Sequence, residues 1–305
     1  MPSHLASDAT NLPDLTAGIG SPPNSWTYSS KTGFDLTHSN TSLEETLTLK
    51  TTTTPITIAP SKSALIIIDM QNFFLSPAFG RKRGAGHDAL DKLVRFAIPA
   101  ARGCGMRVVW VNWGLTEEDM EVMPAGVSRA FGFEGLLDGK KVAVDKHGKE
   151  GGTSRGLGSP CGIVRTEDGE EIDAGRLLMK DSWNAALYPP LDGIFEQGRG
   201  LEKSPDVLIP KNRMSALWSS ETPLNTFLEE EGIKTLLMTG VNTDQCVGGT
   251  FMDAFSKGYD CVLLSDGAGT SSPQFAQECF EYNAAETFGF AMSCEMFAEA
   301  VGVVG

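Results

Sequence analysis

Three residues of different chemistry each end an apolar run of the sequence or follow shortly behind one: Asp69, Lys211 and Cys246. Short apolar runs are typical of strands that are buried on both faces of a parallel sheet. Because ligands bind beyond the carboxyl ends of such strands, we expect the three side chains to meet at one edge of the sheet. A thiolate can attack a carbonyl carbon, a carboxylate can accept the thiol proton, and an ammonium group stabilises both anions.

Cys246 follows the polar turn GVNTD, which comes directly after an apolar run. Thr243 or Asp244 is expected to be the N-cap of the next helix, which would place Cys246 in the first helical turn. Unpaired backbone N–H groups and the helix dipole favour an anion there. We therefore predict that the pKa of Cys246 lies below its usual value of about 8.5. Gly248 and Gly249 indicate a close approach of another backbone or of substrate, or simply close packing.

Taken singly, each of these residues also has a purely structural explanation. Asp69 could cap a turn, and a lysine behind a strand is usually solvated. A cysteine beside an apolar helix face is most often a small core residue. We give that last interpretation to four other cysteines: Cys104, Cys261, Cys279 and Cys294.

From residue 62 onward, apolar runs alternate with helical patterns. Strands are predicted over residues 63–70, 106–113, 206–211, 235–240, 261–266 and 290–294. Helices are predicted over residues 90–101, 223–234, 247–258 and 273–288. This alternation predicts an α/β fold with a doubly wound, mainly parallel six-stranded sheet and helices on both faces, in three Rossmann-like layers.

The pattern divides the chain into an N-terminal extension, residues 1–59, and one domain, residues 60–305. The first 45 residues are rich in Ser, Thr, Pro, Gly and Asn, and we expect an irregular tail or arm. Short edge strands are expected over residues 45–60. An insert at about residues 115–205 is rich in Gly and charge, and its length indicates a lid or a pocket wall.

Composition excludes several classes of function. A formal net charge of −14 argues against a nucleic-acid or anionic-membrane partner, and no apolar run is long enough to cross a bilayer. The first residues do not resemble a secretory signal, and the scattered cysteines suggest free thiols in the cytoplasm. The four histidines lack zinc-ligand spacing, and DMQNFFLSP lacks the glycines of a dinucleotide-binding loop. We expect neither a metal nor a cofactor.

Three segments, ALIIIDMQN, VLIPKNRMSALW and GVNTDQCV, resemble the signature stretches of the isochorismatase-like cysteine hydrolases, and the similarity covers roughly residues 60–300. The resemblance implies an Asp–Lys–Cys catalytic triad of Asp69, Lys211 and Cys246. It also implies a non-proline cis peptide at Val241–Asn242 and an oxyanion hole built from the backbone N–H groups of Asn242 and Cys246. Members of this family commonly form homodimers or homotetramers.

Departures from related families narrow the implied reaction. Isochorismatases proper lack the cysteine, and nicotinamidases carry an Asp-x-His zinc site where this chain reads VNWGLTEED. The chain is most similar to ureidoacrylate amidohydrolases, through WVNWG, a GSP element at residues 158–160, Trp183 and ETFGF. It departs from them at Leu217–Trp218, where relatives tend to have phenylalanine, and in its longer insert.

The resemblance therefore implies a cysteine-dependent amidohydrolase that cleaves a C–N bond of a small amide or ureido (carbamoyl) substrate through a thioester. The alternatives are an isochorismatase-type hydrolase of another small molecule, or a non-hydrolytic binding or redox-sensing protein on the same fold. Five residues are predicted to line the substrate pocket: Asn112, Trp113, Phe73, Trp183 and Trp218.

Overall fold

A six-stranded, all-parallel sheet forms the centre of the molecule. The computed structural model describes residues 13–38, 46–152 and 154–303. The strands lie in the spatial order β12(Val207–Lys211), β7(Arg107–Trp113), β6(Ser63–Ile68), β13(Thr235–Val241), β14(Asp260–Gly269) and β15(Phe290–Met292). This confirms the predicted α/β fold and its six strands. The order reverses direction at β6, so the strands that follow it in the chain are added on both sides, as in a doubly wound sheet.

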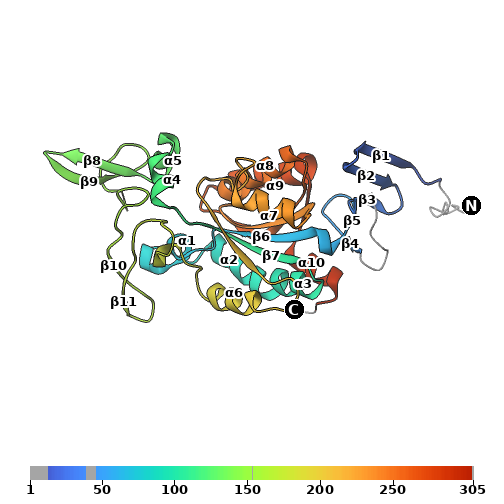
Figure 1. The fold of residues 1–305 in the computed structure, drawn as a ribbon, viewed down its shortest axis with the longest axis horizontal. Helices are drawn as coiled ribbons and strands as arrows, with labels where there is room; N and C mark the ends of the chain where they lie inside the picture. Colours follow the sequence, from blue (N-terminus) through green and yellow to red (C-terminus); the bar gives the residue numbers. More distant parts are fainter. Residues whose placement is uncertain (1–12, 39–45, 153, 304–305) are drawn as a thin grey trace, which may run out of the picture.

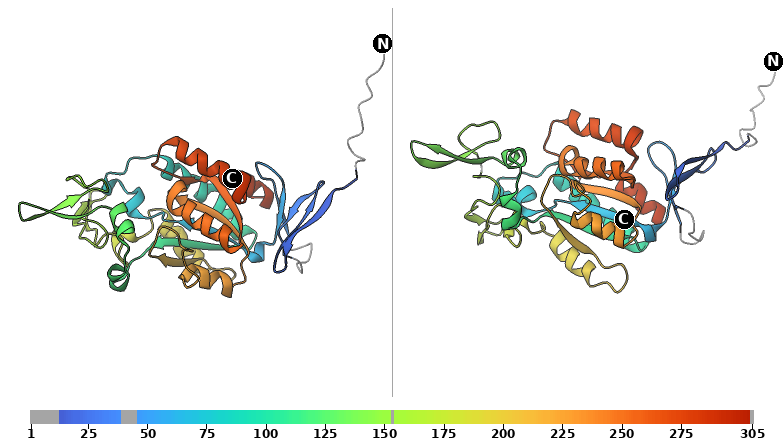
Figure 2. Two further views of the ribbon diagram at one scale, coloured as in Figure 1. Left: turned by 90° about the horizontal axis from the view of Figure 1, so that it is seen from above. Right: turned by 45° about the horizontal axis from the view of Figure 1, so that its top comes forward.

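Helices cover both faces of this sheet (Figure 1 and Figure 2). One face carries α2(Ala85–Lys92), the π-helical turn η4(Leu93–Ala97), α3(Ile98–Gly103) and α10(Cys294–Val301). The other carries α7(Pro223–Glu230), the π-helical turn η6(Thr243–Val247), α8(Gly248–Lys257), α9(Gln274–Asn283) and the π-helical turn η7(Ala284–Phe288). Leu65 and Ile67 of β6 point into the first core, and Ile66 and Ile68 point into the second. The strand is therefore buried on both faces, as its continuous apolar run predicts.

The N-terminal extension differs from the prediction. Residues expected to be irregular form three strands, β1(Thr16–Ser21), β2(Asn24–Ser29) and β3(Gly33–Asp35). They join the expected short strands β4(Leu47–Leu49) and β5(Ile56–Ile58) in one five-stranded sheet. Trp26 and Phe34 of this sheet pack against Phe290 of β15. A composition dominated by Ser, Thr and Gly gives no sign of these aromatic contacts, so the strands were not predicted. Residues 1–12 of the expected arm lie outside the described residues.

The insert contains its own short elements. Two short elements, α1(Asn72–Leu75) and η3(Pro77–Phe79), lie between β6 and β7 and so precede the insert. The helical elements of the insert are α4(Glu117–Glu121), α5(Ala125–Ala130), η5(Trp183–Ala185) and α6(Leu191–Arg199). Its strands form two hairpins, one of β8(Phe133–Leu137) and β9(Lys140–Val144) and one of β10(Ile163–Arg165) and β11(Glu171–Asp173). Figure 1 shows the β8–β9 hairpin at the end of the molecule opposite to the N-terminal sheet. Leu191 of α6 belongs to the first core, so the insert also packs on the central sheet.

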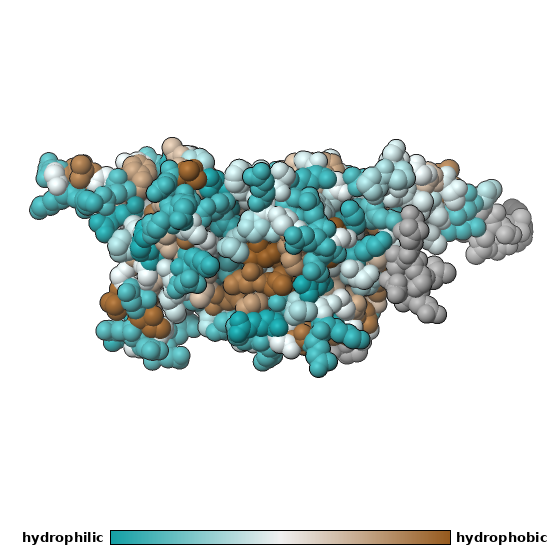
Figure 3. Space-filling model, viewed as in Figure 1, coloured by the Kyte–Doolittle hydropathy of each residue, from teal (hydrophilic) through white to brown (hydrophobic). Residues whose placement is uncertain are grey.

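Polar side chains dominate the surface in the view of Figure 3, and hydrophobic ones gather near its middle, in the region where Figure 1 shows β7. Leu208 on the edge strand β12 is among the exposed large hydrophobic residues. Of the helices within the described ranges, none is long and apolar enough to cross a membrane.

Candidate active site

The three ionisable residues singled out in the sequence arrive at one edge of the sheet. Asp69 directly follows β6, Lys211 is the last residue of β12, and Cys246 lies in η6, which follows β13. The backbone of Asp69 has a φ of +56°, a left-handed conformation that Asp tolerates better than most residues. Its N–H still donates to Val111 O of the neighbouring strand at 2.8 Å, which fixes where the carboxylate begins.

Lys211 lies between the other two side chains. Its Nζ is 3.0 Å from Asp69 Oδ2 and 3.5 Å from Cys246 Sγ. The same ammonium donates to the backbone O of Arg213 at 3.0 Å. Asp69, Lys211 and Cys246 are each less than 5% exposed. The Asp69 Oδ2 contact is an ion pair without hydrogen-bond geometry, while Oδ1 accepts the Trp113 N–H at 3.2 Å.

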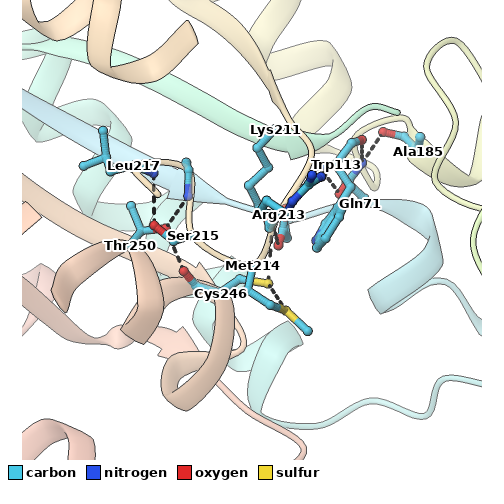
Figure 4. A network of polar contacts seen from close by, with 12 residues as sticks. Gln71, Trp113, Ala185, Lys211, Arg213, Met214, Ser215, Leu217, Cys246 and Thr250 are labelled. Carbon is cyan, nitrogen blue, oxygen red and sulfur yellow. Dashed lines mark hydrogen bonds and ion pairs between the residues drawn. The ribbon is translucent and has the colours of Figure 1, made fainter. Parts of the chain in front are cut away.

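Trp113 covers the ammonium group. The Lys211 Nζ lies 4.0 Å from the centroid of its ring, a cation–π distance (Figure 4). Gln71 holds the Trp113 backbone on both sides, accepting its N–H at 3.1 Å and donating to its O at 2.7 Å. The amide of Gln71 also donates to Ala185 O in the insert, at 2.6 Å. Gln71 was not predicted as a site residue, although it lies inside the segment ALIIIDMQN.

The turn around Cys246 differs in one detail from the sequence expectation. The N-cap is Asn242 rather than Thr243 or Asp244, and it makes no side-chain capping hydrogen bond. Cys246 is therefore the fourth residue of a π-helical turn, so it still belongs to the first turn. The Val241–Asn242 peptide is cis, as the family resemblance implies.

A segment that follows Lys211 packs against this turn. Met214 Sδ lies 3.5 Å from Cys246 Sγ, and Thr250 Oγ1 donates to Cys246 O at 2.8 Å while accepting the Ala216 N–H at 3.1 Å (Figure 4). A Cβ atom on Gly249 would lie 3.6 Å from Ser215 Cβ. This is an ordinary van der Waals distance, so packing does not require a glycine at position 249. A Cβ atom on Gly248 would lie 2.9 Å from Thr243 O and 3.0 Å from a Phe280 ring carbon, so the expected close packing holds at Gly248.

The predicted lowering of the Cys246 pKa is wrong for the free protein. Burial raises the pKa of Cys246 to about 12, and the Lys211 charge opposes this rise only in part. Burial also raises the pKa of Asp69, again against the Lys211 charge. The Trp113 indole N–H lowers the pKa of the thiol as well, although no hydrogen bond of ordinary geometry links the two side chains. The helix start does not compensate for the loss of water, so the resting sulfur is a thiol.

A cavity of about 750 Å³, called here the main cavity, lies beside the turn that precedes Cys246. Its wall includes Val241, Asn242 and Gln245 from that turn, and Phe73 from α1. The insert supplies further wall, including residues 130–132 and 144–146. The triad side chains themselves are not on this wall, which is consistent with their burial behind it.

Of the five residues predicted to line the pocket, only Phe73 is on the main cavity wall among the residues that the structure describes. Trp113 is buried over Lys211, and Asn112 points to the opposite face of β7, where its Oδ1 finds no hydrogen-bond partner within the described chain. Trp183 stacks on Phe79. Trp218 is 50% exposed and lies beside Arg213.

Phe131 is a wall residue that the sequence did not indicate. It lies in the insert just after α5, and its ring is 6.4 Å from Phe73 and 5.0 Å from Trp113, measured between centroids. It therefore connects the main cavity with the residue that covers Lys211. No periodicity or motif in the insert marks this phenylalanine.

Within the described ranges, no three or more His, Cys, Asp or Glu side chains are grouped so that they could hold a metal ion.

Comparison with known proteins agrees with the observed fold. A family model described as the Isochorismatase domain matches residues 155–295, a range that contains Lys211 and Cys246. A cysteine hydrolase from Pseudomonas syringae is similar in structure with a TM-score of 0.52 and 15% identity, over 80% of this chain and 93% of that chain. The nicotinamidase PncA from Bacillus subtilis gives 0.51 and 18% identity, over 76% and 99% of the two chains. At these identities the structural likeness shows the fold alone.

Proposed function

We propose that this chain is a member of the isochorismatase-like family and a cysteine-dependent amidohydrolase, which cleaves a C–N bond of a small amide or ureido substrate through a thioester on Cys246. The observation that carries the proposal is the position of Lys211 Nζ, 3.0 Å from a carboxylate and 3.5 Å from a thiol, with all three groups buried. A structural ion pair needs no thiol beside it, whereas a cysteine nucleophile is activated by an adjacent base or by a neighbouring cation, and both are present here.

The first step is transfer of the thiol proton to Asp69. Burial raises the pKa of the Asp69 carboxyl, which makes its carboxylate a stronger base than a solvated one. The thiolate that forms on Cys246 lies beside the Lys211 ammonium, whose charge lowers the pKa of the thiol. Proton transfer therefore converts one ion pair of Lys211 into another, without creating an isolated buried charge.

The thiolate then attacks the substrate carbonyl carbon and forms a tetrahedral intermediate. We assign the oxyanion to the backbone N–H groups of Asn242 and Cys246, as the family resemblance implies. Donors fixed before the reaction stabilise such an anion without reorganisation. Asp69 returns the proton to the leaving nitrogen, ammonia or an amine departs, and the acyl group stays on Cys246 as a thioester.

Hydrolysis of the thioester completes the cycle. Asp69 is again a free carboxylate, and it accepts a proton from the attacking water. The thiolate leaves and recovers the proton from Asp69, which restores the resting thiol. Lys211 remains next to both groups throughout, so its contribution is electrostatic.

The fold alone does not define the substrate class, but further observations narrow it. Structural neighbours include proteins named nicotinamidase and cysteine hydrolase, which supports hydrolysis of small amides. The segments shared with ureidoacrylate amidohydrolases favour a ureido substrate. The main cavity of about 750 Å³ accommodates a small molecule of either kind.

Ammonia release from a panel of small amides and ureido acids, including ureidoacrylate, tests the proposal. Wild-type protein is expected to hydrolyse at least one member, and Cys246→Ser and Lys211→Ala are expected to hydrolyse none. Cys279→Ser, at an exposed cysteine, is the matched control and should keep wild-type activity. Intact-mass measurement during turnover should reveal an acyl adduct on the wild-type chain that Cys246→Ser lacks. Hydrolysis that survives in Cys246→Ser would overturn the assignment of the nucleophile.

A further inference from the structure

The main cavity has a charge opposite to that of the chain as a whole. The ionisable side chains on its wall are Arg81, Lys82, His87, Asp145 and Lys146. Three of these are cations at neutral pH and one is an anion, whereas the chain carries a formal net charge of −14. A local excess of positive charge in an acidic protein favours the entry of an anionic ligand into this cavity.

The other two ionisable groups on the wall are already used by the protein. Asp145 accepts the backbone N–H groups of His147 and Lys149, at 2.8 and 2.9 Å. His87 is buried, with Nε2 3.0 Å from Leu75 O and with Nδ1 accepting the Gly84 N–H at 3.3 Å. Both imidazole nitrogens therefore bind the backbone, and His87 is not free to meet a ligand. Among the described residues, none of the three cations on this wall forms an ion pair with a carboxylate.

Arg81 is the cation best held for recognition. It is half-buried, its Nε donates to Phe73 O at 3.1 Å, and its guanidinium carbon lies 5.1 Å from the centroid of the Phe73 ring. Within the described ranges, Arg81 forms no ion pair with a carboxylate, and its two terminal nitrogens make no hydrogen bond to the protein. A planar guanidinium group whose Nε is held by the protein and whose two terminal nitrogens have no protein partner suits bidentate binding of a carboxylate.

The position of Arg81 links it to the nucleophile. Arg81 packs on Phe73, the Phe73 ring contacts Phe131, and Phe131 contacts Trp113, which covers Lys211. The main cavity wall includes Arg81 and also Asn242 and Gln245, which belong to the turn before Cys246. A ligand held by Arg81 would thus lie in the cavity that is lined by the turn directly before Cys246.

We propose that Arg81 binds a carboxylate of the substrate, so that the compounds attacked by Cys246 are acidic ureides or acidic amides. This inference rests on the proposed function. Lys82 and Lys146, which are exposed on the same wall, attract the anion, and Arg81 fixes its orientation. Recognition of the charged group at one end of the molecule leaves the neutral carbamoyl or amide group for the thiolate.

Binding is measured first, in the Cys246→Ser background, because it does not depend on hydrolysis. Isothermal titration calorimetry is done with three ureido acids that differ in length, ureidoacetate, 3-ureidopropanoate and 4-ureidobutanoate, and with the neutral alcohol 3-ureidopropan-1-ol. At least one acid should bind about 10- to 100-fold more tightly than the alcohol, the range expected for a charge-assisted, bidentate contact. Arg81→Gln should remove that preference without changing the melting temperature or the affinity for the alcohol.

Arg83→Gln is the matched control. Arg83 is exposed, forms ion pairs with Asp88 and Asp91, and is not on the main cavity wall in the described part of the chain. It should keep the preference for the acid. The proposal is overturned if no acid binds, if acid and alcohol bind equally, or if Arg81→Gln and Arg83→Gln behave alike.

Hydrolysis separates this proposal from the one on which it rests. In the Cys246-containing protein, Arg81→Gln should raise KM for the preferred acid about 10- to 100-fold while kcat changes little. Tight, Arg81-dependent binding of an acid without ammonia release would leave the carboxylate site in place and contradict the amidohydrolase function. Hydrolysis of neutral amides with the same KM in the wild-type and Arg81→Gln proteins would support the amidohydrolase function and contradict the carboxylate site.

Discussion

The Lys211 ammonium lies 4.0 Å from the centroid of the Trp113 ring, and that ring also contacts Phe131 of the insert. Trp113 therefore has two effects on the sulfur. Its ring holds the cation that stabilises a thiolate, and its indole N–H lowers the pKa of Cys246 directly. Because Trp113 is 1% exposed, it also excludes the water that would otherwise solvate the anion. Trp113 thus stabilises a thiolate on Cys246 through the held cation and the indole N–H, and destabilises it by excluding water.

Trp113→Phe separates these effects, because it keeps an aromatic face over Lys211 and removes the indole N–H. We expect the pKa of Cys246 to rise and its alkylation by iodoacetamide at pH 8 to slow several-fold. Trp110→Phe is the control: its N–H donates to Asp206 Oδ2 at 2.9 Å, and its side chain lies in the other core. That variant should lose about 1–2 kcal/mol of unfolding free energy and alkylate at the wild-type rate. Equal slowing in both variants would contradict the role of Trp113.

The resting protonation state of Cys246 predicts the pH dependence of its reactivity. Because burial raises the pKa of the thiol to about 12, the thiolate fraction should grow with pH throughout the range from 7 to 10. The rate of iodoacetamide alkylation should therefore rise about tenfold per pH unit, with no plateau. Subtracting the rate measured on Cys246→Ser removes the contribution of the other cysteines. A plateau near pH 8 or below would mean that the thiolate already exists in the free protein.

The sequence predicted that Asp69, Lys211 and Cys246 lie close together, because sheet geometry brings strand ends together. Asp69 and Lys211 lie at or directly behind the carboxyl ends of β6 and β12, and only β7 separates these two strands. The direction of the Cys246 pKa shift could not be predicted in the same way. Desolvation depends on which side chains close over the sulfur, and Trp113 and Met214 reach it from elsewhere in the chain. A local argument from the helix start considers the dipole alone.

The positions of the candidate pocket residues were predicted less well than the proximity of Asp69, Lys211 and Cys246, for a related reason. Four of the five residues chosen for aromatic or polar character at strand ends and in the insert lie off the main cavity wall among the described residues. The wall comes instead from loops of the insert, where Phe131 has no periodic pattern around it, and from Arg81 in the loop after η3. Loop conformation is set by tertiary contacts, so residue type alone does not place such side chains.

Gly240 is predicted to be irreplaceable at the end of β13. It has a φ of +108°, and a Cβ atom there would collide with the backbone of Ile68. Gly240→Ala should therefore cost roughly 3 kcal/mol or more of unfolding free energy, from conformational strain together with overpacking. Gly139→Ala is the control, because its φ is +77° but nothing lies within 4 Å of the added carbon.

The control substitution should cost only about 1–2 kcal/mol, since it introduces the strain without the collision. Urea unfolding of both variants, followed by circular dichroism, measures the difference. If Gly240→Ala unfolds at the same urea concentration as Gly139→Ala, the turn before Cys246 relaxes more easily than the contact with Ile68 indicates.

The N-terminal sheet is attached to the domain through a buried charge pair whose strength should depend on pH. His38 Nε2 lies 2.7 Å from Asp260 Oδ2, and Asp260 also accepts the Trp26 indole N–H at 2.7 Å and the Thr235 hydroxyl at 2.9 Å. The hydrogen bond to Asp260 raises the pKa of His38 above its usual value of about 6.5. The native state therefore binds the imidazole proton more tightly than the unfolded chain does.

It follows that His38 contributes its full stabilisation below about pH 6.5 and loses it as the pH rises through the higher native pKa. His38→Gln should lower the unfolding free energy by roughly 1–3 kcal/mol at pH 6 and by clearly less at pH 9. His147→Gln, at an exposed histidine of the insert, should change neither value. Urea denaturation of the three proteins at both pH values decides the matter. A loss in His38→Gln that is equal at pH 6 and pH 9 would show that His38 packs against the domain without carrying a charge.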